Sequence, residues 1–227
     1  MTDKQRSHFC GHIFIIHVFI KNIMKIELEK DFFIVGIDEA GRGPLAGPVC
    51  VGAVGYVQRG RSDVAGQTPL LEGIKDSKKL SAKKREEWFK ILQENKEFEC
   101  HHVFVSNEMI DNFGIRKAVI FGVEKVLEKF SQKPDMVLMD GSLFAPEKYK
   151  QETIIKGDEK VPLISAGSII AKVSRDRVMM NMHKKYPEYC FNEHKGYGTK
   201  KHFEKIIKHG FCEIHRKTFC GNVVSLA

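Results

Sequence analysis

The sequence has no CxxC pair, no long low-complexity segment and no apolar run of the roughly 20 residues that cross a bilayer. Its cysteines stand far apart, at positions 10, 50, 100, 190, 212 and 220. This scatter argues against a zinc ribbon or a thioredoxin-type site, and it favours a reducing, cytoplasmic setting. The apolar stretch at residues 13–20 is too short for a span and has no clean basic flank or cleavage site, so a secretory signal is not expected.

Zinc-ligand residue types gather near the carboxyl terminus, at His209, Cys212, His215 and Cys220. Their side chains suit zinc, but their spacing matches no common zinc module. We therefore expect packed cysteines here, with histidines that are solvated or face phosphate.

Length and charge bound the fold and the partner. A chain of 227 residues that is 42% hydrophobic can bury one sizeable core. The formal net charge of +8 favours a polyanion, above all nucleic acid, although many mildly basic proteins bind none. The segment that begins at Met24 reads as a complete start. We predict an extension outside the fold at 1–23, a catalytic domain with a C-terminal helical segment at 24–219, and a tail at 220–227.

Strands alternate with helices along the chain, which predicts a mixed α/β sheet. Strands are predicted over residues 32–38, 49–57, 99–105, 136–140 and 153–158, the first two forming a hairpin. Helices are predicted over residues 81–93, 108–130, 165–183 and 200–208.

Acidic residues end three of these strands, as Asp38 with Glu39, Asp140 and Asp158. Ligands of open α/β sheets gather beyond strand ends, so these acids could converge. Their repulsion would then call for a divalent cation, and oxygen ligands favour Mg²⁺ or Mn²⁺. Any one of them alone is more often a turn former or a helix cap. All four together predict a metal site.

The stretch GRGPLAG at 41–47 is neither a Walker loop nor a dinucleotide fingerprint, because Gly-Lys-Ser/Thr does not follow and Ala46 occupies the third glycine position. Its glycines let backbone amides approach a ligand, and Arg42 can bind phosphate or stack. Tyr197 lies between two glycines, as a stacking platform or an ordinary loop tyrosine. Basic runs usually form a solvated face, but three of them could line a phosphate-binding groove, at 74–85, 171–177 and 195–217.

Seven motifs together resemble ribonuclease HII in order and spacing. They are GIDEAGRGPLAGPV (36–49), DSKKLS (76–81), MDGS (139–142), KGD (156–158), SAGSIIAKVSRDR (165–177), HKGYGT (194–199) and HRKTF (215–219). The likeness runs from about Ile34 to Phe219, and its first and fifth motifs are the most specific. Ribonuclease HIII is a weaker match because the glycine loop reads GRGP here.

The resemblance implies a ribonuclease H-like sheet flanked by helices. It also implies an endonuclease that hydrolyses the RNA strand of RNA–DNA hybrids and incises 5′ of ribonucleotides embedded in duplex DNA. The family's four metal-binding acids match Asp38, Glu39, Asp140 and Asp158. With two divalent ions, Mn²⁺ or Mg²⁺, they would leave a 5′-phosphate and a 3′-hydroxyl.

The same resemblance assigns substrate contacts. The loop that senses the ribose 2′-hydroxyl matches Gly41, Arg42 and Gly43. Tyr197 matches the residue that packs on the deoxynucleotide after a single ribonucleotide. Candidate phosphate contacts are Lys79, Lys172 and Arg175.

Two other functions are compatible with parts of the pattern. A different carboxylate-metal nuclease, such as a resolvase or an exonuclease, would share the acids but not the ribose-sensing loop. A non-catalytic nucleic-acid-binding module would bind duplexes with strong salt dependence and without a metal requirement. We expect the hybrid-cleaving enzyme, as a monomer without membrane attachment.

Overall fold

The computed structural model describes residues 31–58 and 68–221. The predictions for residues 1–23 and for the tail beyond residue 221 lie outside these ranges. Cys220, the first residue of the predicted tail, is described, and it is fully buried. Within the described residues, none of the helices combines the length and apolarity that crossing a bilayer requires.

A five-stranded mixed sheet forms the centre of the protein, in the order β3-β2-β1-β4-β5. On one side, β1 (Phe32–Ala40) pairs antiparallel with β2 (Val49–Gln58), which pairs antiparallel with β3 (Phe98–Val105). On the other, β1 pairs parallel with β4 (Met136–Asp140), which pairs parallel with β5 (Gln151–Ile154). The predicted mixed α/β sheet and its hairpin are confirmed.

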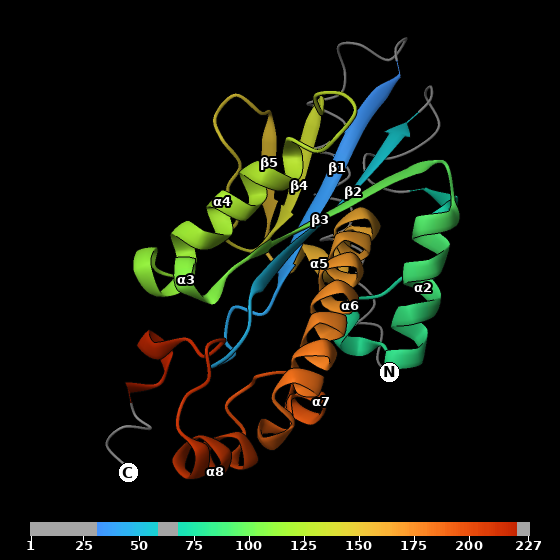
Figure 1. The fold of residues 1–227 in the computed structure, drawn as a ribbon. Coiled ribbons are helices and arrows are strands. Elements are labelled where there is room, and N and C mark those ends of the chain that lie inside the picture. Colours follow the sequence, from blue (N-terminus) through green and yellow to red (C-terminus); the bar gives the residue numbers. More distant parts are fainter. Residues whose placement is uncertain (1–30, 59–67, 222–227) are drawn as a thin grey trace, which may run out of the picture.

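Helices cover both faces of this sheet (Figure 1). The longer ones are α2 (Ala82–Glu94), α3 (Asn107–Phe113), α4 (Ile115–Leu127), α6 (Pro162–Lys185) and α8 (Lys200–His209). Single turns are η1 (Pro69–Leu71), η2 (Ser77–Lys79), α5 (Gly157–Lys160), η3 (Pro187–Tyr189), α7 (Phe191–His194) and η4 (Lys217–Phe219). The helix predicted from Ser81 is confirmed, because the Ser81 side chain caps α2 by accepting the N–H of Lys84.

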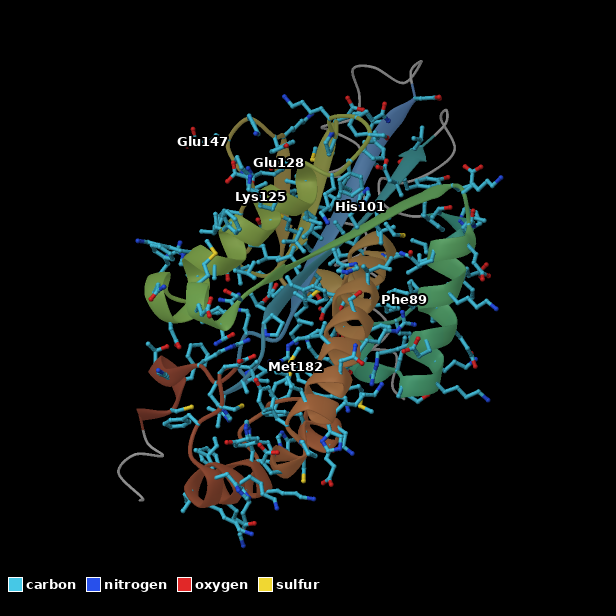
Figure 2. All side chains as sticks on the ribbon, viewed as in Figure 1. Phe89, His101, Lys125, Glu128, Glu147 and Met182 are labelled. Carbon is cyan, nitrogen blue, oxygen red and sulfur yellow. The ribbon has the colours of Figure 1, made fainter. Side chains whose placement is uncertain are left out.

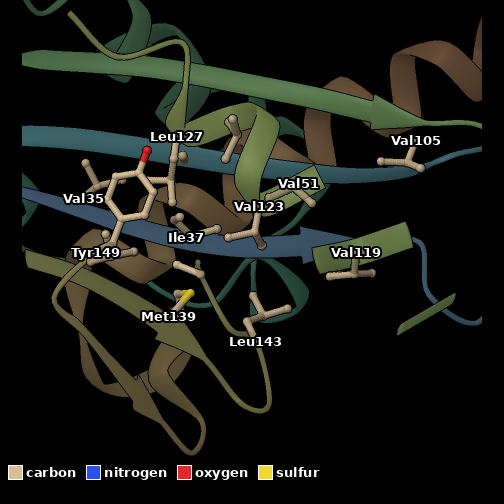
Figure 3. Packing of buried hydrophobic residues seen from close by; sticks show 14 of the residues in the cluster. Val35, Ile37, Val51, Val105, Val119, Val123, Leu127, Met139, Leu143 and Tyr149 are labelled. Carbon is tan, nitrogen blue, oxygen red and sulfur yellow. The ribbon is translucent and has the colours of Figure 1, made fainter. Parts of the chain in front are cut away.

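Side chains alternate along β1 between two cores, as the period of a strand requires. Val35 and Ile37 pack under α4, with Val123 and Met139, on one face (Figure 3). Ile34 packs on the opposite face, in the core that α6 and α2 cover. Charged pairs remain outside these cores, as do Lys125 on α4 and Glu128 just after it (Figure 2).

Helix α6 approaches the sheet closely because glycines line the contact. A Cβ at Gly36 would lie 2.4 Å from the Leu163 carbonyl oxygen, and a Cβ at Gly52 would lie 2.4 Å from that of Gly167. The helix therefore packs directly on the backbone of β1 and β2, beside the strand end that carries Asp38.

Two predicted elements were wrong. The helix predicted over 108–130 is two helices, because Gly114 adopts a φ of 81° and ends α3 before α4 begins. The strand predicted to end on Asp158 stops at Ile154. Lys156 then turns the chain in the left-handed region, and Asp158 lies in the short helix α5.

Candidate active site

Three carboxylates meet at one end of the sheet. Oxygen atoms of Asp38, Asp140 and Asp158 all lie within 4.8 Å of one another. Asp38 comes from β1, Asp140 is the last residue of β4, and Asp158 comes from α5. The structure thus brings together three of the four predicted acids.

Hydrogen bonds explain how Asp158 reaches this group although its strand ends early. The Asp140 Oδ1 atom accepts the N–H of Gly157 at 2.6 Å and that of Asp158 at 3.4 Å. The Ser165 hydroxyl in α6 donates to the carbonyl oxygen of Asp158 at 2.7 Å. Helix α5 is therefore fixed at both sides, and it places its carboxylate beside β4.

Glu39 lies next to this group without belonging to it. Its Oε1 atom is 3.3 Å from the Arg42 guanidinium, and its N–H donates to Asp38 Oδ1 at 2.7 Å. Its carboxylate is still near enough to Asp38 and Asp140 for their charges to affect one another. Burial raises the pKa of Glu39, while the Arg42 charge opposes that rise.

The clustered acids resist full ionisation. Burial raises the pKa of Asp38 well above its ordinary value, and the negative charge of Glu39 adds to the effect. Burial likewise raises the pKa of Asp140, and the adjacent Asp158 carboxylate contributes. A divalent cation would remove both penalties, and a set of carboxylate oxygens suits Mg²⁺ or Mn²⁺. The site therefore fits the predicted metal.

Sequence reasoning missed Lys78, which lies closer to the acids than Lys79 does. The Lys78 ammonium is 3.3 Å from Asp158 Oδ2, whereas Lys79 pairs with Glu159 at 2.8 Å. The segment is held there by a 2.8 Å hydrogen bond between the hydroxyls of Ser77 and Ser168. The only signal in the sequence was the basic run itself, which does not say which lysine faces the acids.

The glycine loop contains both buried and exposed glycines. Gly41 has a φ of 96°, and a Cβ there would lie 2.0 Å from Arg175 Nε, so the fold requires glycine. Gly43 is exposed, and a Cβ there would meet no atom within 4 Å. Glycine at position 43 is therefore not explained by internal packing, and it leaves space for a ligand beside the Arg42 backbone.

Tyr197 lies against this loop and is 41% exposed. The two loops are joined where the N–H of Leu45 donates to the Gly196 carbonyl oxygen at 2.8 Å. The Lys172 ammonium lies 5.8 Å from the Tyr197 ring centroid and pairs with Asp176 at 2.8 Å. The structure therefore places the glycine loop and the segment that carries Tyr197 side by side.

Arg175 differs from the other predicted substrate contacts because it is fully buried. Its guanidinium donates to the carbonyl oxygens of Ala46, Pro48 and Lys195. A direct phosphate contact by Arg175 stays a prediction, and this burial does not favour it.

The C-terminal cysteines and histidines form a packed cluster. The only group of metal-ligating side chains found in residues 31–58 and 68–221 is the acidic one. Cys220 is buried in the core with Tyr189 and Phe191, as expected of a packed cysteine. His209 is exposed, but His215 is buried, so the expectation of a solvated histidine was wrong at that position.

Comparisons with known proteins agree with the motif pattern. A family model described as Ribonuclease HII matches residues 35–222. A ribonuclease HII of Caldicellulosiruptor bescii is 44% identical over 86% of this chain and 89% of its own. One of Coxiella burnetii is 43% identical over 84% of this chain and 89% of its own.

Solved structures show the same fold. The ribonuclease H2 of Pyrococcus horikoshii superposes with a TM-score of 0.68 at 26% identity, over 86% of this chain and 98% of its own. A PCNA:RNase HII complex from Archaeoglobus fulgidus gives a TM-score of 0.65 at 27% identity, over 82% and 94%.

Proposed function

The chain belongs to the ribonuclease HII family and is a ribonuclease H, and we propose that it hydrolyses RNA–DNA hybrids and incises duplex DNA 5′ of embedded ribonucleotides. One observation carries the proposal beyond family membership. The carboxylate group of Asp38, Asp140 and Asp158 lies at the end of β1, and the loop that follows β1 directly exposes Gly43. A phosphate bound through divalent ions that these acids hold would therefore lie near backbone amides suited to sensing an adjacent ribose.

Asp38, Asp140 and Asp158 would hold the divalent ions, with Glu39 completing the set from the neighbouring position. Two such ions would activate water and stabilise the leaving 3′-oxygen, which gives a 5′-phosphate and a 3′-hydroxyl. The protein's own contribution is to hold the carboxylates in place before substrate arrives. Asp140 does so through its bonds to α5. Lys78 offsets part of the negative charge at Asp158.

Substrate recognition would come from the two joined loops. The N–H groups of Arg42 and Gly43 are the candidates for contact with the 2′-hydroxyl, the group that distinguishes RNA from DNA. Tyr197, 41% exposed, would pack on the following deoxynucleotide. Lys79 and Lys172 remain candidate phosphate contacts at the edges of the site.

The decisive test is cleavage of a labelled DNA duplex that contains one ribonucleotide, with Mg²⁺, with Mn²⁺ and with chelator. An all-DNA duplex of the same sequence is the control. Metal-dependent incision on the 5′ side of the ribonucleotide supports the acids and the ribose-sensing loop together. Equal cutting of the all-DNA duplex would indicate a general carboxylate-metal nuclease. Binding without cutting in any metal would indicate a non-catalytic module.

We further propose that the enzyme works as a monomer in the reducing cytoplasm. All five cysteines in the described ranges are free thiols, which agrees with that setting. Light scattering on the purified protein tests the monomer, and a dimer mass would overturn it.

A further inference from the structure

Two arginines, Arg175 and Arg216, head the fully buried side chains of the described protein by size. Buried charges are normally paired with an opposite charge, because leaving water is costly. In the described part of the chain, neither guanidinium forms a salt bridge within 4.0 Å. Their bonding partners therefore identify what these two charges hold in place.

Both guanidinium groups donate to main-chain carbonyl oxygens of the glycine loop (residues 41–47), and Arg175 also donates to Lys195 in the tyrosine loop (residues 194–199). Arg216 donates to Gly41 at 2.7 Å, to Arg42 at 2.9 Å and to Gly47 at 2.9 Å. Arg175 holds the far end of the same loop at Ala46 and Pro48. Of the two arginines, only Arg216 hydrogen-bonds to Gly41 and Arg42, which are assigned to ribose recognition.

The hydrogen bonds from Arg216 determine the direction in which the N–H groups of the glycine loop point. In a planar trans peptide, the C=O and the following N–H point in opposite directions, and the described chain has no cis peptide bond. Because the Gly41 and Arg42 carbonyls are directed inward to Arg216, the N–H groups of Arg42 and Gly43 are directed away from it. Those two residues are exposed, so the freed donors face the substrate side.

The charge on Arg216 strengthens the same donors. Burial, followed by the nearby Arg175 charge, lowers the pKa of Arg216 to about 9, so the guanidinium is still cationic at neutral pH. A cation on the carbonyl side polarises each peptide unit and makes its N–H a better hydrogen-bond donor.

The preceding residue, His215, reaches the other loop through His202. The His202 Nδ1 atom is 3.0 Å from the Tyr197 carbonyl oxygen, which only accepts, so Nδ1 carries the proton. The His202 Nε2 atom must then accept from His215 Nε2, 3.1 Å away. The remaining nitrogen, His215 Nδ1, lies 3.0 Å from the N–H of Cys212, 3.1 Å from its Sγ and 3.3 Å from its carbonyl oxygen. Accepting the Cys212 N–H is the role that agrees with a proton on His215 Nε2.

The backbone of this dipeptide is itself tied to the glycine loop. The N–H of Arg216 donates to the Leu45 carbonyl at 2.7 Å. An antiparallel bridge joins Ala46 to His215. One dipeptide thus holds the glycine loop with one side chain and the tyrosine loop with the other.

We propose that His215 and Arg216 are positioning residues that set the glycine and tyrosine loops against each other and thereby determine how well the enzyme cleaves at a single ribonucleotide. This inference rests on the proposed function. A duplex with a lone ribonucleotide has one 2′-hydroxyl and can bind productively in one position only. If the loop is misplaced, the enzyme cannot use another 2′-hydroxyl instead. A continuous hybrid offers a 2′-hydroxyl at every RNA position.

Arg216→Lys is the primary test, because lysine keeps the charge but lacks the planar guanidinium that donates to all three carbonyl oxygens. We expect kcat on the single-ribonucleotide duplex to fall roughly 10- to 100-fold more than kcat on a continuous hybrid, the scale of a misplacement near 1 Å. The matched control is Arg116→Lys, because Arg116 is an exposed arginine of α4 and lies outside the three basic runs predicted to line a phosphate-binding groove. That control should cleave both substrates as the wild type does. The melting-temperature rise with Mn²⁺ should survive in both variants, because the acids are untouched.

Equal losses on both substrates, or no loss on either, would overturn the proposal. If Arg216→Lys does not fold, the pair His202→Asn and His202→Leu decides. Asparagine offers a donor near the position of Nδ1, so His202→Asn should keep most of the activity on the single-ribonucleotide duplex relative to the continuous hybrid. His202→Leu should lose that relative activity. Equal relative activity in the two variants would also overturn the proposal. Failure of the wild type to cut at a ribonucleotide would instead refute the proposed function.

Discussion

The Asp140 carboxylate accepts the main-chain N–H of Gly157 at 2.6 Å. This bond joins the end of β4 to the short helix that carries Asp158, two segments that are not paired as strands at that point. One acid therefore positions another. The close carboxylates repel one another, and the first two predictions concern the effect of that repulsion on activity and stability.

Asp140→Asn should abolish turnover while largely sparing substrate binding. The amide cannot supply the anionic ligand, so kcat should fall by about three orders of magnitude, the scale of several kcal/mol of transition-state stabilisation. The Asn oxygen can still accept from Gly157, so the variant should fold, with a metal-free melting temperature no lower than that of the wild type. Glu152→Gln, a half-buried acid on β5, is the matched control. Near-normal turnover would remove Asp140 from the mechanism.

Metal binding should stabilise the protein more at high pH than at low pH. The pKa values of Asp38, Glu39 and Asp140 are raised in the folded state, so the metal-free fold takes up protons more readily than the unfolded chain. Their contribution to stability therefore rises as pH falls toward the ordinary carboxyl values. Mg²⁺ or Mn²⁺ competes with those protons, and should add about 2.7 kcal/mol at a hundredfold excess over Kd. Melting curves at pH 8 and pH 6 measure this, and an equal metal effect at both would contradict it.

Gly43→Ala should separate activity from stability. A Cβ at position 43 meets no protein atom within 4 Å, so the free energy of unfolding should change by less than about 0.5 kcal/mol. Cleavage should fall, because the methyl group would occupy the space left for the substrate. Gly41→Ala provides the contrast, since its φ of 96° and its contact with Arg175 should cost stability. Unchanged cleavage in Gly43→Ala would remove this glycine from substrate contact.

Tyr197→Ala should impair single-ribonucleotide cleavage most. Loss of one stacking contact costs about 1–3 kcal/mol, which corresponds to roughly a 5- to 150-fold loss. Tyr197→Phe keeps the ring and should retain most activity. Steady-state assays on the single-ribonucleotide duplex and on a continuous hybrid compare the two. A uniform loss on both substrates would favour a general binding role.

The buried histidine pair should make stability fall below pH 6.5. Burial lowers the pKa of His202 and of His215 to about 4, so the unfolded chain binds more protons than the fold between those limits. Each histidine can cost on the order of 3 kcal/mol as pH falls through this window. Protonation would also turn the acceptor nitrogen of His202 into a second donor facing His215. The carboxylates act in the opposite direction, so the measurement is the difference in melting temperature between wild type and His202→Asn, which should shrink as pH falls from 6.5 to 4. A constant difference would refute this account.

Much of the fold followed from local pattern. The apolar runs of β1, β2 and β4 and the Ser81 cap of α2 depend on nearest neighbours along the chain, so periodicity and capping residues predicted them correctly. The helix over 108–130 failed because a single backbone angle at Gly114 decides it. Composition does not reveal that φ is positive there. Asp158 was placed on a strand for the same reason, since the left-handed turn at Lys156 has no glycine to signal it.

The chain's residue types and their order determined by themselves which chemistry is present: four acids, a glycine loop, a tyrosine between glycines, and basic runs. Tertiary structure alone decided which of these meet. It brought oxygen atoms of Asp38, Asp140 and Asp158 within 4.8 Å of one another and placed the Lys78 ammonium beside Asp158. It also buried Arg216 and Arg175, the latter a predicted phosphate contact. The physical reason is that burial and hydrogen-bond partners depend on contacts between residues far apart in sequence. Arg216 and Gly41, which are separated by most of the folded chain, show that dependence directly.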